Sequence, residues 1–201
     1  MLQRWKKKNE TKRSDRRRYY GKPAFAAAVK IDSFAYMPVQ DFGNAFSTFI
    51  APNYGAGKEK RISQGIKSAV TAAFAFCLVI SAAVCAFAAP LMGIFVKASE
   101  KETISIGVGY LRIEGAFYFG IGLLFLLYGY YRAVKMPGMS VILTILSLGT
   151  RVVLAYILSA IPAVGVTGIW VSVPIGWALA DMVGVVYYWK KMRKAQMIAG
   201  N

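Results

Sequence analysis

The chain has 201 residues, of which 57% are apolar, and its mean hydropathy is +0.46. Soluble domains are about 45 to 50% apolar, so this composition argues against an ordinary soluble protein. The 25 Lys and Arg side chains outnumber the 9 Asp and Glu side chains, which gives a formal net charge of +16. Histidine is absent, which excludes Ser-His and Cys-His catalysis and imidazole metal sites. We therefore expect a protein that is not an enzyme and that holds no metal or organic cofactor.

The first 23 residues form a basic segment with ten cations and only two acids. A composition of this kind, with few aliphatic side chains, is typical of a disordered tail. Its charge alone would allow it to bind RNA or anionic lipid. We expect a solvated tail with no specific nucleic-acid partner, and a second short tail at residues 195–201.

Long apolar runs follow this segment and predict membrane-spanning helices. Residues 68–96 carry no charged side chain, and a helix of that length, at about 1.5 Å per residue, crosses a hydrocarbon core of about 30 Å. A second charge-free run is interrupted by Pro162 and Gly165, which favours two helices. The sequence predicts an all-α integral membrane protein in which residues 24–194 form a bundle of about five transmembrane helices, at about residues 24–54, 68–96, 104–131, 139–160 and 166–189.

The distribution of Lys and Arg between the loops predicts how these helices are oriented, because cytoplasmic loops collect cations. The loop after the first span, the turn after the third span and the C-terminal end together carry ten cations, whereas the opposite loops carry two. We expect a multi-pass protein of the inner (plasma) membrane, in contact with the lipid bilayer and with the ten cations in the cytoplasm. Five spans then leave the basic segment 1–23 outside, against the same rule.

A short glycine motif lies at the end of the first predicted span. Residues 55–58 read GAGK, but Pro52 and Glu59 stand where a phosphate-binding loop needs Gly and then Ser or Thr. The phosphate-loop interpretation therefore fails. Pro52 and the two glycines instead predict the end of the first helix.

Taken as a whole, the stretch from Ala26 to Gly65 resembles one passage of the multidrug and toxic compound extrusion (MATE) transporters, and the similarity continues to about residue 194. The resemblance implies the C-terminal lobe, equivalent to helices eight to twelve of twelve. A seventh helix and a whole N-terminal lobe would precede this lobe in a complete transporter, so we expect an incomplete chain whose partner is the missing lobe. The positions that carry the resemblance are Lys30, Asp32, Pro38, Asn53, Gly55, Gly57 and Arg61.

Three positions depart from the family pattern. Pro52 stands where members usually have Gln, and Ala133 follows Arg132 where they usually have Gly. Ile121 occupies the place of an aspartate that binds a cation in some members. The best-described cation site of the family is therefore not expected in this chain.

The resemblance implies the export of drugs or other amphipathic organic compounds, often small organic cations, in exchange for Na⁺ or H⁺. One alternative is a flippase for lipid-linked precursors or polysaccharides, which shares the broader fold and tends to need cations in its cavity. Deep acids outnumber the one deep cation here, which favours the export of cations. Another alternative is a non-transporting membrane fragment whose basic tail binds lipid or RNA.

Charged residues within the predicted spans are the candidates for an ion or substrate pathway, since a charge near the membrane centre costs at least about 2.5 to 3.5 kcal/mol. Lys30, Asp32, Arg112 and Glu114 lie near the outer ends of their spans, where a structural role is expected because long side chains can reach the interface.

The deeper charged residues are Asp41, Arg151 and Asp181. An ion pair between Arg151 and Asp181 is one interpretation, although their depths differ by about 8 Å. Asp41 follows Pro38, where a broken helix can expose carbonyl oxygens to a cavity or an ion. It is the preferred ion or proton site, and the full set of pathway candidates is Asp41, Asp181, Arg151, Asp32 and Glu114.

Overall fold

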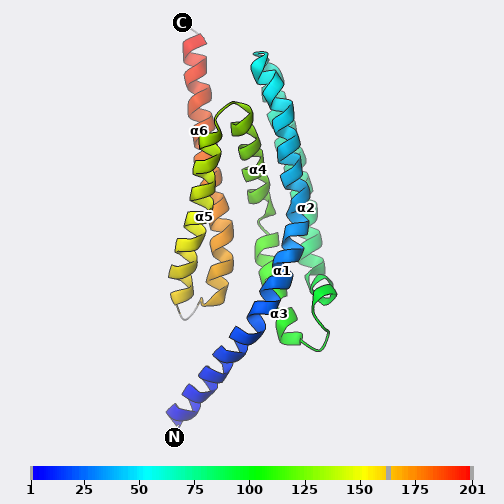
Figure 1. Ribbon diagram of the computed structural model, residues 1–201, viewed down its shortest axis with the longest axis vertical. Coiled ribbons are helices and arrows are strands. Elements are labelled where there is room, and N and C mark those ends of the chain that lie inside the picture. Colours follow the sequence, from blue (N-terminus) through cyan, green and yellow to red (C-terminus); the bar gives the residue numbers. More distant parts are fainter. Residues whose placement is uncertain (1, 162–163, 200–201) are drawn as a thin grey trace.

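The computed structural model describes the backbone of residues 2–161 and 164–199 and the side chains of residues 23–161 and 164–191. The described residues form a bundle of long helices, and no strand occurs among them (Figure 1). The predicted all-α fold is therefore confirmed. The helices are α1 (Leu2–Gly55), α2 (Glu59–Phe95), α3 (Lys101–Gly115), α4 (Tyr118–Ala133), α5 (Pro137–Ala160) and α6 (Val166–Ala199).

Both terminal segments differ from their prediction as tails. Helix α1 begins at Leu2 and includes the basic segment, and α6 continues to Ala199. Lys, Arg and Gln are good helix formers, and residues 2–20 contain neither Gly nor Pro to stop a helix. In Figure 1 the N-terminal part of α1 extends beyond the other helices.

Three helices within the described part of the chain are long and apolar enough to cross a membrane: α2, α5 and residues Val166–Lys191 of α6. Helices α3 and α4 meet this test only as a pair, bent by 52°. The predicted third span is therefore two helices rather than one. Helix α1, which holds the predicted first span, is not among the candidates, and it carries Lys30, Asp32 and Asp41 at that place.

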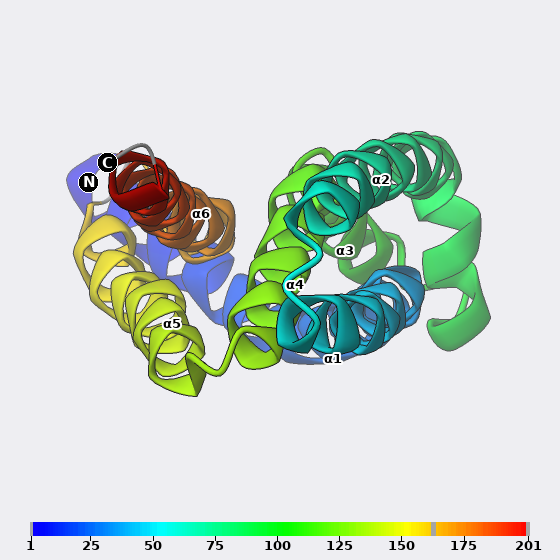
Figure 2. The same ribbon diagram turned by 90° about the horizontal axis from the view of Figure 1, so that it is seen from above.

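The helices are arranged around α4. Helices α5 and α6 pack together on one side, and α1, α2 and α3 lie on the other (Figure 2). Two glycines allow α1 and α4 to approach closely, because a Cβ atom added to Gly129 would overlap the carbonyl oxygen of Gly43. Small residues are used in this way at helix contacts within membranes.

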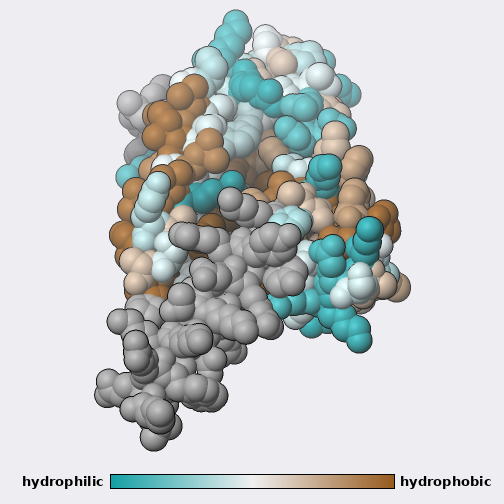
Figure 3. Space-filling model, turned by 60° about the horizontal axis from the view of Figure 1, so that its bottom comes forward, coloured by the Kyte–Doolittle hydropathy of each residue, from teal (hydrophilic) through white to brown (hydrophobic). Residues whose placement is uncertain are grey.

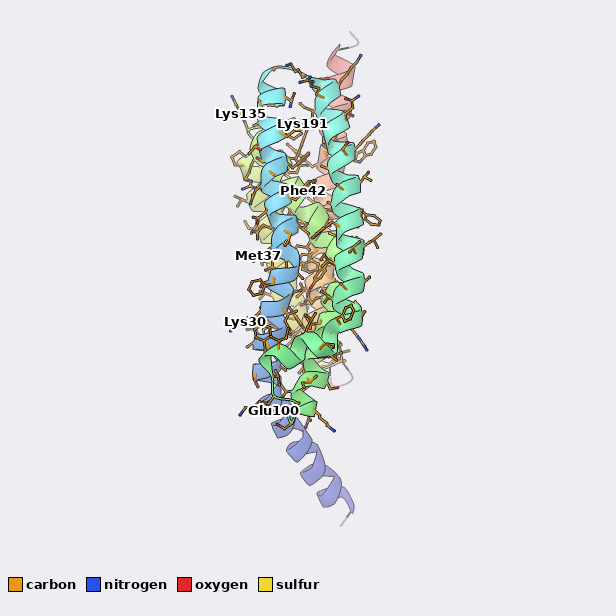
Figure 4. All side chains as sticks on the ribbon, turned by 90° about the vertical axis from the view of Figure 1, so that its right-hand side faces the viewer. Lys30, Met37, Phe42, Glu100, Lys135 and Lys191 are labelled. Atoms are coloured by element: carbon orange, nitrogen blue, oxygen red, sulfur yellow. The ribbon has the colours of Figure 1, made fainter. Side chains whose placement is uncertain are left out.

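The three segments that share the ten cations lie at one end of the bundle. The loop between α1 and α2, the turn between α4 and α5, and the C-terminal part of α6 meet at the top of Figure 1. Figure 4 shows Lys135 and Lys191 at this end and Glu100 toward the other. The structure thus confirms that these segments share a face. The assignment of this face to the cytoplasm stays a prediction.

Candidate functional site: a buried acidic cluster beside a cavity

Asp32 is held inside the bundle by a tyrosine from another helix. The hydroxyl group of Tyr118, at the start of α4, donates a hydrogen bond of 2.6 Å to Oδ1 of Asp32 on α1. Asp32 is 6% exposed and Tyr118 is 1% exposed. A buried carboxyl group requires such a partner to offset its lost hydration. The hydrogen bond from Tyr118 therefore supplies the structural role that the sequence predicts for Asp32.

Glu114 has no such partner. It is fully buried in the last turn of α3, and neither Oε1 nor Oε2 has a hydrogen-bond partner. The structural role expected for Glu114 finds no hydrogen-bond partner, because Glu114 is buried beside the bend between α3 and α4. Lys30 and Arg112, by contrast, are exposed.

The bend that places Glu114 is a local departure from helical hydrogen bonding. The amide of Phe117 donates to the carbonyl oxygen of Glu114 at 3.0 Å, and the amide of Gly120 donates to that of Phe117 at 2.9 Å. These are contacts three residues apart, tighter than the α-helical spacing of four. Helix α2 packs against the bend, since a Cβ atom on Gly115 would lie 3.3 Å from Cγ1 of Val84.

A cavity of about 460 Å³ adjoins Asp32. Residues of α1, α3, α4, α5 and α6 line it, so that it lies where the two sides of the bundle face each other. Its wall is formed mainly by aromatic and aliphatic side chains, with a minority of polar groups, as is typical of sites for small organic molecules. The aromatic residues are Phe25, Tyr36, Tyr110, Phe125, Tyr128, Trp170 and Trp177, and the polar and charged ones are Asp32, Gln40, Thr144, Ser147 and Arg151.

Arg151 and Asp181 do not form the ion pair that was considered from the sequence. Arg151 lies level with Gly176, since a Cβ atom on that glycine would be 3.7 Å from Cβ of Arg151. Asp181 is five residues further along α6, about 7.5 Å at the helical rise. Its Oδ1 atom has no hydrogen-bond partner, and its Oδ2 atom lies 3.7 Å from where a Cβ atom on Gly120 would be.

Asp41, the preferred ion site, is not brought together with the other acids. It is exposed, it does not line the cavity, and it lies nine residues beyond Asp32 on the same helix. The structure places Pro38 in α1 without interrupting that helix. A role for Asp41 stays a prediction without support from the geometry of the described residues.

The motif positions at the end of α1 form a helix cap. Gly57 has φ +65°, the amide of Lys58 donates to the carbonyl oxygen of Asn53 at 2.9 Å, and the amide of Gly57 donates to that of Tyr54 at 3.2 Å. This pair of bonds is the Schellman motif, which needs glycine at the left-handed position. The cap explains why the stretch resembles a phosphate loop without being one, and it places Arg61 at the basic end of the bundle.

Sequence reasoning did not find the tyrosines of this site. Tyr110 precedes Glu114 by four residues and Tyr118 follows it by four. In an unbroken helix this spacing would place the three side chains on one face. The pattern of one acid between two tyrosines was therefore visible in the sequence and could have singled out Glu114.

A bundle of helices that are long and apolar enough to cross a membrane, with a cavity and buried acids between them, is the architecture of a membrane protein. The chain belongs to the MatE family, whose model matches residues 23–157.

Curated relatives and solved structures agree with this assignment. The chain is 26% identical over 187 residues to a Bacillus subtilis (strain 168) protein named as a probable multidrug resistance protein, YoeA, covering 90% of this chain and 40% of YoeA. It is 29% identical over 175 residues to YpnP, similarly named and from the same organism, covering 84% of this chain and 38% of YpnP. The chain therefore spans about two fifths of the length of these relatives.

Among solved structures, the outward-facing conformation of a multidrug resistance MATE family transporter of the MOP superfamily matches with a TM-score of 0.79 and 23% identity, over 88% of this chain and 39% of that one. A MATE crystal structure in the bent conformation matches with a TM-score of 0.81 and 20% identity, over 90% and 40%. These likenesses establish the fold, that of about two fifths of a MATE transporter.

Proposed function

We propose that this chain forms one lobe of an antiporter that exports drugs or other amphipathic organic compounds in exchange for Na⁺ or H⁺. The second lobe would be its partner, and the inner (plasma) membrane its location. The observation that carries this proposal is the cavity of about 460 Å³, whose aromatic wall includes one carboxyl group, Asp32. Aromatic faces and a carboxylate together attract organic cations.

The balance of charge inside the bundle favours cations over lipid pyrophosphates. Three acids, Asp32, Glu114 and Asp181, are buried, whereas Arg151 is the cation that lines the cavity. A flippase for lipid-linked precursors would instead need an excess of cations around its anionic head group. That second candidate rests on Arg151 alone.

Helix α5 supports the location in lipid. Apolar side chains on this helix are exposed, among them Ile145, Val153 and Tyr156, and Figure 3 shows hydrophobic patches among paler residues at the upper left of the molecule. Apolar patches of this extent are covered by lipid or by protein. One face toward lipid and one toward a second lobe would cover them.

The test is a chimera in which this chain replaces the matching stretch of YoeA. It is produced in a Bacillus strain that lacks YoeA, and the release of ethidium, an amphipathic organic cation, is measured with and without an imposed Na⁺ or H⁺ gradient. We expect release that depends on a gradient from the chimera, and none from this chain alone, because one lobe cannot enclose a substrate.

Two variants sharpen the result. Trp177→Ala removes an aromatic wall of the cavity and is expected to weaken ethidium release, whereas Ile145→Ala, on the exposed face of α5, is the matched control and is expected to leave it unchanged. A membrane-inserted chimera that releases no dye, or ethidium release by this chain alone, would contradict the proposal.

A further inference from the structure

We propose that Glu114 is the proton-binding group of this chain and that Asp32, with Tyr118, is the fixed partner beside it. The inference deepens the proposed function by naming H⁺ rather than Na⁺ as the coupling ion. Only this assignment of the coupling ion rests on the proposed function. The site itself is a property of this chain and can be tested without transport.

The first observation is a carboxyl group with nothing to stabilise its charge. Glu114 is fully buried, and both of its oxygen atoms lack a hydrogen-bond partner. Burying an ionised carboxylate without a partner is among the costliest arrangements in a protein interior. A bound proton removes that charge and requires no further ligand.

The second observation is that two donors near Glu114 are already engaged. The hydroxyl group of Tyr118 donates to Asp32 at 2.6 Å. The thiol of Cys85, on α2, donates to the carbonyl oxygen of Arg112 at 3.8 Å. Neither group is left to donate to Glu114, so the structure satisfies one carboxyl group of the pair and leaves the other open.

The third observation is the unequal treatment of two buried acids. Asp32 and Glu114 are both buried, but only Asp32 receives a hydrogen bond, from Tyr118. Because Tyr118 holds Asp32 and Glu114 has no partner, a proton belongs on Glu114.

The charged and titratable groups near Glu114 come from five helices. Tyr110 and Arg112 are on α3 itself, Asp32 and Tyr36 are on α1, Cys85 is on α2, Tyr118 begins α4, and Arg151 comes from α5. Helix α6 presents Trp170, whose ring meets that of Tyr110 at 6.0 Å and cannot titrate. The arginine on α3 is exposed and lies two residues from Glu114, so it faces away.

The position of the site suits exchange of a proton with the cavity. Asp32 and Tyr110 line the cavity and Glu114 does not. A proton arriving from the cavity therefore meets Asp32 before Glu114. The bend of 52° between α3 and α4 lies next to Glu114.

The experiment is carbodiimide labelling of the purified full chain in detergent. Dicyclohexylcarbodiimide modifies protonated carboxyl groups in apolar surroundings, and mass spectrometry of peptides locates the modified residue. We expect modification at Glu114 that falls about tenfold for each pH unit above its midpoint, as the protonated fraction does. We also expect that Na⁺ at constant pH leaves the modification unchanged. Asp41, which is exposed, is the internal control and is expected to stay unmodified.

Variants test the assignment. Asp32→Asn removes the second acid and keeps Glu114, so labelling is expected to persist with a shifted midpoint, whereas Glu114→Gln is expected to abolish it. No labelling of Glu114 in the wild-type chain at any pH, or protection of Glu114 by Na⁺, would overturn the proposal. Labelling of Glu114 together with a chimera that releases no dye would support the proton site and contradict the proposed function.

Discussion

The hydrogen bond between Tyr118 and Asp32 gives the sharpest prediction for stability. Tyr118→Phe keeps the ring, which is 1% exposed, and removes the hydroxyl group that donates to Oδ1 of Asp32 at 2.6 Å. Because Asp32 is itself only 6% exposed, little water can take the place of the lost donor. The variant is expected to leave a buried acceptor without a partner.

The expected loss follows from the nature of that bond. A hydrogen bond to a charged group contributes about 1.5 to 3 kcal/mol, and an abandoned buried acceptor costs about 1 to 3 kcal/mol. We therefore expect Tyr118→Phe to lower the free energy of unfolding by about 2 kcal/mol. In the background Asp32→Leu, where no acceptor is present, the same substitution is expected to cost about 0 kcal/mol, because the two effects are not additive when residues are in contact.

The assay is unfolding of the chain by sodium dodecyl sulfate in mixed micelles, followed by tryptophan fluorescence. Tyr156→Phe is the matched control, because Tyr156 is 77% exposed on α5 and its hydroxyl group is accessible. The reasoning is refuted if Tyr118→Phe costs the same in both backgrounds, or if it costs no more than Tyr156→Phe.

Three further predictions concern packing, capping and orientation. Gly129→Ala is expected to lower the free energy of unfolding by about 1 to 3 kcal/mol, since its Cβ atom meets a carbonyl oxygen of α1. Gly149→Ala is the control, because the space around Gly149 is open and no such cost is expected. Equal effects of the two substitutions would contradict the close packing of α1 and α4. Gly57→Ala is expected to lower the free energy of unfolding by about 1 to 2 kcal/mol in the same assay, because φ is +65° at this residue. An unchanged free energy of unfolding would argue against the helix cap. Cysteines at Lys60 and Lys101 are expected to react with an impermeant thiol reagent from opposite sides of the membrane, and labelling from one side would disprove the predicted orientation.

The sequence was sufficient for the class of protein and for most of its helices. Charge-free runs and the prolines between them located α2, α5 and α6, because hydrocarbon admits only long apolar segments with paired backbone groups. The unequal distribution of Lys and Arg grouped the loops correctly by face. The motif from Lys30 to Arg61 led to the family, and its glycines are explained by the cap at the end of α1.

The tertiary structure decided where the buried charges meet. Sequence position alone placed Glu114 near a helix end, where it would reach the interface, but the bend between α3 and α4 directs it inward. The sequence favours Asp41 as the ion site because it follows Pro38, yet α1 continues through that proline and leaves Asp41 exposed. Periodicity records which residues share a face of one helix. Whether a face meets lipid, a cavity or another acid depends on how the helices pack against one another, and that arrangement is a property of the whole bundle.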